Sequence, residues 1–329
     1  MTTAPRTLTL ENDVLRLELV STGAAVARLE VHGANVALGH PGATAYREVG
    51  GYLGAVIGRV GNRIDQGRFT LDGTTHQIPA NNGPNALHGG PDGFDARDWT
   101  LADAGPEHAT WTLVSPDGDQ GFPGEVEVSL TYTLSGGRVT LDYAATTTAP
   151  TPLNLTHHGY VNLDGEDAGE VTGHVLSVDA DAFLPTRPDQ IPTGEIRPVE
   201  GTAFDLREPV ELSTLLPPPQ DEQAQIAGGI DHHFVVRGEG LRRHARLVGA
   251  SGLALEVWSD RPGVQVYTGA QFDGGIVGTS GRPYGPYAGV ALETQGYPDA
   301  VNHAHFPSVI LRPGERFAST TQWRFSHGG

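Results

Sequence analysis

The most chemically informative segment of the chain covers residues 290–301, with the sequence VALETQGYPDAV. Its carboxylate, Glu293, follows a short apolar run and precedes two turn-forming residues, Gly296 and Pro298. A carboxylate near the end of a buried strand, directed toward a loop, is a common arrangement for a general base in a cleft. The reference pKa of a glutamate side chain, about 4.3, makes it anionic at neutral pH. Glu293 is therefore the first candidate for a base.

A second proton-transfer group is expected at the histidine pair His157 and His158. Successive side chains of a strand point to opposite faces, so only one of the two can face a given cleft, and Tyr160 shares the face of His158. The reference pKa of an imidazole, about 6.5, can be raised by a neighbouring carboxylate. We expect Asp231 to raise the pKa of His158 in this way. Two opposed groups of this kind can move protons without a nucleophile or a redox centre.

Five other polar residues are candidates for ligand binding because they lie close to glycines, which let a backbone approach a ligand. They are Asn62, Arg63, His88, Asp231 and Gln265. A planar guanidinium beside an amide is suited to binding two neighbouring hydroxyls. Each residue also has an ordinary structural explanation. Arg63 and Asp231 could each cap a turn, His88 could make a purely structural hydrogen bond, and a strand residue at 265 could face solvent.

Metal, phosphate and serine-nucleophile sites are poorly supported. His303 and His305 have the spacing of metal ligands on a strand, which permits a non-haem metal site, but no facial-triad pattern accompanies them. Asp273 precedes two glycines without a following lysine or helix, which indicates a turn and no phosphate loop. The chain contains no Gly-x-Ser-x-Gly motif. We therefore expect no metal site.

Composition excludes several classes of function. The formal net charge of -18 disfavours binding to nucleic acid and to anionic lipid, and it suits a neutral small molecule better than a phosphorylated one. The absence of cysteine excludes disulfides, zinc-thiolate sites and thiol nucleophiles. No apolar run approaches the roughly 20 residues that span a bilayer, and the first ten residues lack the apolar region of a secretory signal. We expect a soluble, cytoplasmic protein that is a monomer or a homodimer.

Alternation of apolar and polar residues dominates the sequence. Such alternation covers residues 126–134 and 139–143, on either side of Gly136 and Gly137, and predicts a β-hairpin. A second hairpin is expected where Ser251 and Gly252 join residues 245–248 to 253–258, and further strands at 14–20 and 264–267. The 45 glycines and 24 prolines agree with many short strands joined by turns.

Helical patterns are few. Residues 211–216 and 220–226 could each form a short helix, on either side of the run Pro217-Pro218-Pro219. This run is the best linker candidate, but strand-like alternation resumes beyond it, and no repeat of 20–50 residues is visible. We predict an all-β fold in which residues 1–329 form one domain, a large antiparallel β-sandwich with little helix around a polar cleft.

The order and spacing of six motifs resemble those of the aldose 1-epimerase (galactose mutarotase) family, from about residue 51 to 315. The motifs are IGRVGNR at 57–63, LHGG at 87–90, NLTHHGY at 154–160, GIDH at 229–232, PGVQ at 262–265 and LETQGYPDAVN at 292–302. The resemblance implies a galactose mutarotase-like β-sandwich that interconverts the α and β anomers of free aldohexoses such as glucose and galactose, with no metal or organic cofactor.

The resemblance also implies residue roles. The catalytic base falls on Glu293 and the catalytic acid on His158. The sugar-contacting residues fall on Asn62, Arg63, His88, Tyr160, Asp231 and Gln265. Tyr160 could offer an apolar face to the C–H groups of the sugar.

Three residues depart from the family pattern. His157 and His233 stand where the family often has asparagine, and Gly159 stands where it often has serine. These departures leave the reaction unchanged and put the sugar preference in question. The competing interpretations are a non-catalytic carbohydrate-binding module on the same fold, a relative acting on a phosphorylated hexose, and a histidine-ligated metal enzyme.

Overall fold

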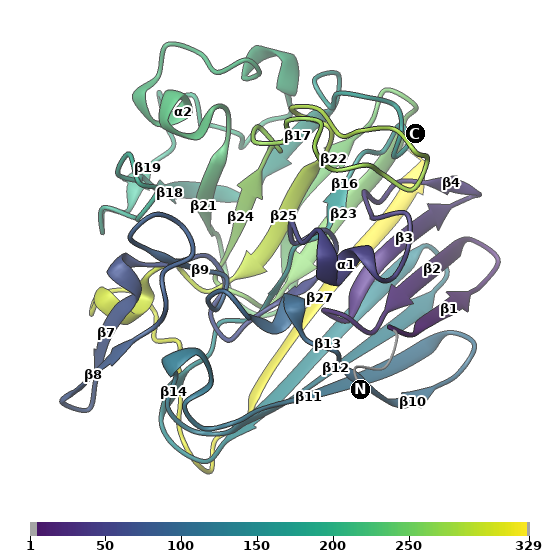
Figure 1. Ribbon diagram of the computed structural model, residues 1–329. Coiled ribbons are helices and arrows are strands. Elements are labelled where there is room, and N and C mark those ends of the chain that lie inside the picture. The colour runs from purple at the N-terminus through teal and green to yellow at the C-terminus, as the bar shows by residue number, and fades with distance from the viewer. Residues whose placement is uncertain (1–4, 328–329) are drawn as a thin grey trace.

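The computed structural model describes residues 5–327 and consists mainly of strands in two large antiparallel sheets (Figure 1). The nine-stranded sheet has the order β10 (Thr100–Ala104), β11 (His108–Ser115), β12 (Val126–Ser135), β13 (Arg138–Thr147), β27 (Phe317–His327), β23 (Leu253–Ser259), β22 (Arg242–Val248), β17 (Val175–Val178) and β20 (Val210–Glu211). The six-stranded sheet has the order β16 (Tyr160–Val161), β25 (Val290–Gln295), β24 (Gly263–Tyr267), β21 (Asp231–Val236), β18 (Ala180–Leu184) and β19 (Arg197–Pro198).

Smaller sheets complete the architecture. A four-stranded sheet contains β1 (Thr7–Glu11), β2 (Leu15–Val20), β3 (Ala25–Val31) and β4 (Ala34–Asn35). The two-stranded pairs are β14 (Thr151–Pro152) with β26 (Ile310–Leu311), β15 (Thr156–His157) with β5 (Val56–Ile57), β6 (Arg63–Ile64) with β9 (Ala86–Leu87), and β7 (Arg68–Leu71) with β8 (Thr74–Gln77). The prediction of an all-β, antiparallel fold with little helix is confirmed.

The two hairpins predicted from alternation are present. In the first, β12 and β13 pair from Val126 opposite Thr147 to Ser135 opposite Arg138, so that Gly136 and Gly137 form the turn. Gly136 has φ +54°, a left-handed conformation that glycine adopts without strain. The apolar residues of β12 alternate with its polar ones in burial, as the period of two requires. The second hairpin joins β22 to β23 through residues 249–252.

One hydrophobic core draws side chains from both large sheets. It includes Trp323 of β27, Leu255 of β23, Val264 of β24 and Leu292 of β25. Burial of an aliphatic or aromatic side chain of this size stabilises the fold by roughly 1.5–3 kcal/mol. Both β24 and β25 are buried on both faces, so their polar residues lie inside the molecule. The two strands that carry Gln265 and Glu293 are therefore held rigidly.

Helices are short, as predicted. The α-helices are α1 (Ala45–Glu48) and α2 (Glu222–Ala227), and the 3₁₀ turns are Asp65–Gly67, Phe94–Ala96, Asp119–Gly121, Leu212–Thr214 and Ala300–Asn302. The side chain of Asp221 caps α2 by accepting hydrogen bonds from two backbone N–H groups at its start. The helix expected at 211–216 is only a 3₁₀ turn, because the prolines at 217–219 cannot extend a helix. No helix within residues 5–327 is long and apolar enough to cross a membrane.

Candidate active site

The six-stranded sheet aligns four of the candidate residues on one of its faces. Gln265 of β24 lies directly opposite Glu293 of β25. Asp231 of β21 lies opposite Tyr267, and Tyr160 of β16 lies opposite Ala291, two residues before Glu293. Directly opposed residues share a face, as do residues two apart on one strand. Pairing of the strands thus brings together residues that are distant in the sequence.

Glu293 differs from its expected setting. It lies within β25, which continues to Gln295, rather than at the end of the strand, and only 1% of its surface is exposed. Gln265 is also buried, with 3% exposure, so the interpretation of a solvent-facing glutamine is wrong. Both β24 and β25 are buried on both faces, which explains the burial of Gln265 and of Glu293. Alternation of apolar and polar residues identifies a solvent-facing side of a strand only when one face of its sheet is exposed to water.

The histidine pair divides between the two faces as predicted. His158 follows β15 and faces the site, where its ring packs 4.9 Å from that of Tyr160. His157 points into the core. Its Nε2 lies 3.1 Å from the Tyr132 hydroxyl and its ring meets Trp323 edge to face at 4.8 Å. Of these two histidines, only His158 lines the cavity.

Asn62 and His88 bind each other from two adjoining loops. Both have left-handed backbones, with φ +63° and +53°. The His88 N–H donates to the Asn62 carbonyl at 3.0 Å, and the Asn62 N–H donates to Nδ1 of His88 at 3.1 Å. Burial, together with the charges of His158 and Arg63, lowers the pKa of His88 well below its usual value. The ring of His88 is therefore neutral, and because its Nδ1 accepts a hydrogen bond, its single ring proton is on Nε2. His88 is thus a hydrogen-bond donor toward the cavity.

These side chains surround a cavity of about 220 Å³. Seven of the eight predicted site residues line it: Asn62, Arg63, His88, His158, Tyr160, Asp231 and Glu293. Gln265 is not among the lining residues. It lies beneath the wall and donates from Nε2 to Oδ1 of Asp231 at 2.7 Å, which orients that carboxylate.

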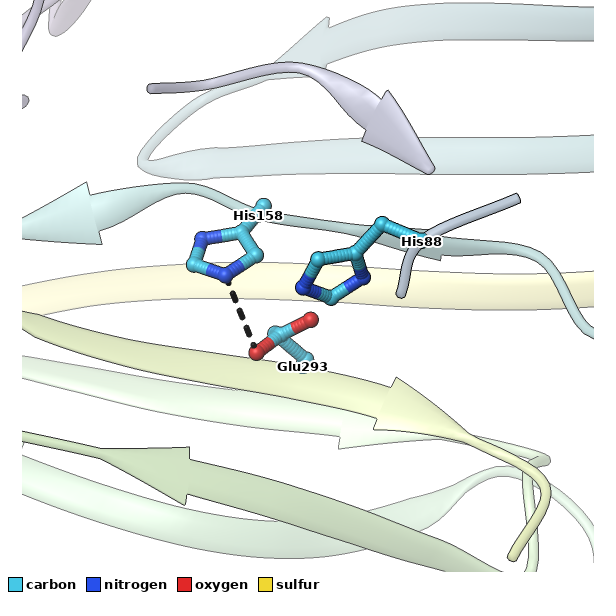
Figure 2. A group of neighbouring side chains, drawn as sticks. All are labelled: His88, His158 and Glu293. Atoms are coloured by element: carbon cyan, nitrogen blue, oxygen red, sulfur yellow. Dashed lines mark ion pairs between the residues drawn. The ribbon is translucent and has the colours of Figure 1, made fainter. Parts of the chain in front are cut away.

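His158 and Glu293 are neighbours in the cavity wall. Nε2 of His158 lies 3.5 Å from Oε1 of Glu293, and Figure 2 shows both groups and the ring of His88 directed toward one another. The candidate acid and the candidate base are therefore adjacent to each other in the wall. An adjacent pair can serve two oxygen atoms that are bound to the same carbon.

Burial governs the charge of this pair. It raises the pKa of Glu293 well above its usual value, and the charge of Asp231 adds to the rise whereas that of Arg63 opposes it. Burial lowers the pKa of His158 to about 4. The expected effect of Asp231 on His158 is wrong, because Asp231 acts on Glu293 instead. Burial thus favours the neutral form of each group, the protonated carboxyl of Glu293 and the unprotonated imidazole of His158.

Several residues of the cavity wall were missed by sequence reasoning. The most prominent is Tyr52, whose ring stacks 5.8 Å from that of His158 and packs 4.6 Å from that of His88. Gly50 and Gly51 precede it, so the proximity to glycine used for the other candidates could have found it. The other missed residues are Gly51, Leu87, Tyr267, Gln271, Phe272 and Ile276.

The chemistry of His88 argues against a metal ion at this cluster. One ligand atom each from His88, His158 and Glu293 lies within 4.8 Å of the others. An imidazole nitrogen must present a lone pair to a metal, but Nε2 of His88 carries the proton. At the other suspected pair, Nε2 of His303 lies 3.6 Å from Asp299, and Nε2 of His305 lies 2.8 Å from the Gly194 carbonyl. Both of these histidines lie outside the cavity wall.

None of the three departures from the family pattern lines the cavity. A Cβ at Gly159 would lie 3.1 Å from Nδ1 of His157, so the glycine leaves room for the larger histidine beside it. His233 lies opposite Gln265 and packs 5.0 Å from the ring of Tyr297. Any effect of these residues on sugar preference is therefore indirect.

Comparisons with known proteins agree with this geometry. The family model described as "Aldose 1-epimerase" matches residues 6–324. A galactose mutarotase from Bos taurus is 45% identical, with 96% of this chain and 93% of that protein covered. An aldose 1-epimerase from Escherichia coli K12 is 37% identical, with 97% and 95% covered. A solved structure of a GalM/aldose epimerase homologue from C. elegans superposes with a TM-score of 0.92 at 29% identity, covering 99% of this chain and 100% of that one. The chain belongs to the aldose 1-epimerase family.

Proposed function

We propose that this protein is an isomerase that interconverts the α and β anomers of free aldohexoses such as glucose and galactose. The observation that carries the proposal is the adjacent pair of proton-transfer groups, His158 and Glu293, in the wall of a polar cavity. The names of the relatives, galactose mutarotase and aldose 1-epimerase, support the same reaction.

The reaction needs two coupled proton transfers. A base removes the proton from O1 while an acid gives a proton to the ring oxygen O5, and the C1–O5 bond opens to the aldehyde. Rotation about C1–C2 presents the other face of the carbonyl, and ring closure returns both protons, so that atoms and electrons balance. O1 and O5 are both bonded to C1. An acid and a base that lie 3.5 Å apart can therefore reach the two oxygens together.

The pair holds the single proton that this chemistry requires. Burial favours this proton on Glu293, and its transfer to His158 gives an anionic base and a cationic acid. The charge of Arg63 lowers the pKa of Glu293 and so favours this ion pair. The charge of Asp231 raises the pKa of Glu293 and opposes it. We propose that Glu293 acts as base on O1 and His158 as acid on O5, with the proton distribution set when sugar binds.

The remaining wall residues suit a neutral polyhydroxylated ligand. His88 donates from Nε2, the Arg63 guanidinium donates to sugar oxygens, and the Asp231 carboxylate accepts. Tyr160 and Phe272, whose rings lie 5.0 Å apart, give the C–H groups an apolar surface. Oδ1 of Asn62 accepts a hydrogen bond from the backbone N–H of Arg63 at 2.8 Å. The side-chain amide nitrogen of Asn62 therefore remains available to the sugar.

The alternatives fit these residues less well. A non-catalytic carbohydrate-binding module needs the binding groups but has no use for a buried acid–base pair. A relative acting on a phosphorylated hexose needs several cations to hold the phosphate, and among residues 5–327 Arg63 is the only lysine or arginine that lines the cavity. A single domain over residues 1–329, a cytoplasmic location and a monomeric or homodimeric state remain predictions.

The proposed function is tested by polarimetry. Crystalline α-D-glucose or α-D-galactose is dissolved with a strong chelator, and the change in optical rotation is followed with and without protein. We expect the protein to accelerate the approach to equilibrium with the chelator present. Failure to accelerate it for several aldoses would overturn the proposed function, and acceleration that the chelator abolishes would favour the metal enzyme.

A further inference from the structure

The guanidinium of Arg63 is held by two amide side chains from different loops. Nε donates to Oδ1 of Asn82 at 3.0 Å, and Nη2 donates to Oε1 of Gln190. Nε and Nη2 lie on the same edge of the planar guanidinium, so these two bonds fix its plane. Within residues 5–327, Nη1 has no hydrogen bond to a protein acceptor, and Arg63 lines the cavity. The free edge of Arg63 is therefore available to a ligand.

The two loops that supply these amides are tied to each other. Nδ2 of Asn85, in the loop of Asn82, lies 3.3 Å from the carboxylate of Asp189, the residue before Gln190. Arg187 binds both Asp189 and Asp65, at 2.9 and 2.8 Å. Gln190 has a left-handed backbone with φ +62°, an unusual conformation for a residue with a side chain. Such conformations persist where the surrounding contacts enforce them, as this network does.

The chemical type of the two acceptors matters as much as their positions. Amide oxygens orient a guanidinium without cancelling its charge, whereas a carboxylate would form an ion pair with it. The nearby carboxylates of Asp65 and Asp189 are already engaged by Arg187. The positive charge of Arg63 consequently remains available to the cavity, where it lowers the pKa of Glu293.

We propose that Gln190, together with Asn82, is a positioning residue that presents Arg63 to the sugar as an oriented cation without a counter-charge. Neither residue belongs to the motifs that indicate the family, and neither lines the cavity. The inference rests on the proposed function, because it assigns Arg63 a sugar oxygen as its partner. It predicts that Gln190 affects sugar binding only through Arg63.

The test is a double-mutant cycle of Gln190→Met and Arg63→Met, with kcat and KM measured by polarimetry on the full-length protein. Gln190→Met should raise KM about tenfold, the value of one hydrogen bond to a charged group, with kcat nearly unchanged. In the Arg63→Met background the same change should have no further effect on kcat/KM. Gln120→Met is the matched control, since Gln120 also has a left-handed backbone, φ +51°, in a turn outside the cavity wall.

A second variant keeps the inference testable if Arg63→Met is too slow to assay. Gln190→Glu retains an acceptor for Arg63 but adds a counter-charge, so KM should stay near the wild-type value. The alkaline limb of the kcat/KM profile, which follows the ionisation of Glu293, should move to higher pH. The new carboxylate at position 190 would offset the charge of Arg63, which lowers the pKa of Glu293. The inference would be overturned if Gln190→Met changed kcat/KM equally in the wild-type and Arg63→Met backgrounds, or did not change KM at all. An alkaline limb that does not move in Gln190→Glu would also overturn it. An inactive wild-type protein would instead overturn the proposed function.

Discussion

His158→Gln should make the fold more resistant to acid. The pKa of His158 is about 4 in the folded protein because of burial, and an imidazole in an unfolded chain has a reference pKa of about 6.5. Since the folded-state pKa is the lower one, the unfolded chain binds a proton first as the pH falls. Stability is therefore lost as the pH drops below about 6.5, and the loss continues to about 4.

The size of this effect follows from the two pKa values. Over the full interval the loss is 6.5 minus 4, or about 2.5 pKa units, and one unit corresponds to about 1.36 kcal/mol, which gives about 3 kcal/mol. Between pH 7.5 and pH 5.0 the same linkage gives a loss of about 2 kcal/mol. Glutamine at position 158 does not titrate, so the variant should escape this loss.

The assay is urea denaturation of both proteins at pH 7.5 and pH 5.0. Packing lost through the substitution affects both pH values alike, so it cancels in the difference between them. The variant should gain about 2 kcal/mol relative to wild type at the lower pH. His327→Gln, at an exposed position away from the cavity wall, is the matched histidine control. A difference near zero, or a loss for His158→Gln, would show that His158 is protonated in the folded protein and would refute the neutral pair.

Three further predictions follow from the same site. Asp231→Asn removes a charge that raises the pKa of Glu293, so the alkaline limb of kcat/KM, where the pair loses its last proton, should move to lower pH in a pH–rate profile. Glu293→Gln should gain stability over wild type as the pH rises above about 4.3, the pKa of an unfolded glutamate, because the raised pKa of Glu293 makes its ionisation unfavourable in the folded state. Melting temperatures at pH 5 and pH 9 check this. His157→Asn should lose about 1–3 kcal/mol of stability through its contacts with Tyr132 and Trp323, with kcat/KM kept within about threefold, as denaturation and polarimetry would show.

The sequence predicts the elements of this fold well because most strands have one face on the core and one toward solvent. The alternation over β12 and β13 gave the hairpin and its two-residue turn, which the structure confirms. Alternation does not predict exposure at β24 and β25, because both faces of these strands are buried and their polar residues lie inside the molecule. Gln265 and the position of Glu293 within its strand were misjudged for this reason.

The candidate residues could be named from motifs, but their relations could not. The fold places Glu293 beside His158, which lies 135 positions earlier in the chain, and this contact shows that the two share one wall. The pKa directions depend on how completely these groups are buried, which no local pattern reveals. Tyr52 and Gln190 have left-handed backbones and contact His158 and Arg63, respectively, which lie far away in the sequence.

The central claim is that Glu293 transfers a proton in the reaction. The most direct test compares kcat for the mutarotation of a single aldose by Glu293→Gln and by Glu166→Gln. Glu166 is also a buried glutamate, but it binds the Tyr284 hydroxyl outside the cavity wall. We predict that Glu293→Gln lowers kcat by about 10²–10⁴-fold while sugar binding persists, and that Glu166→Gln leaves kcat near wild type. Near-normal turnover by Glu293→Gln would contradict the claim.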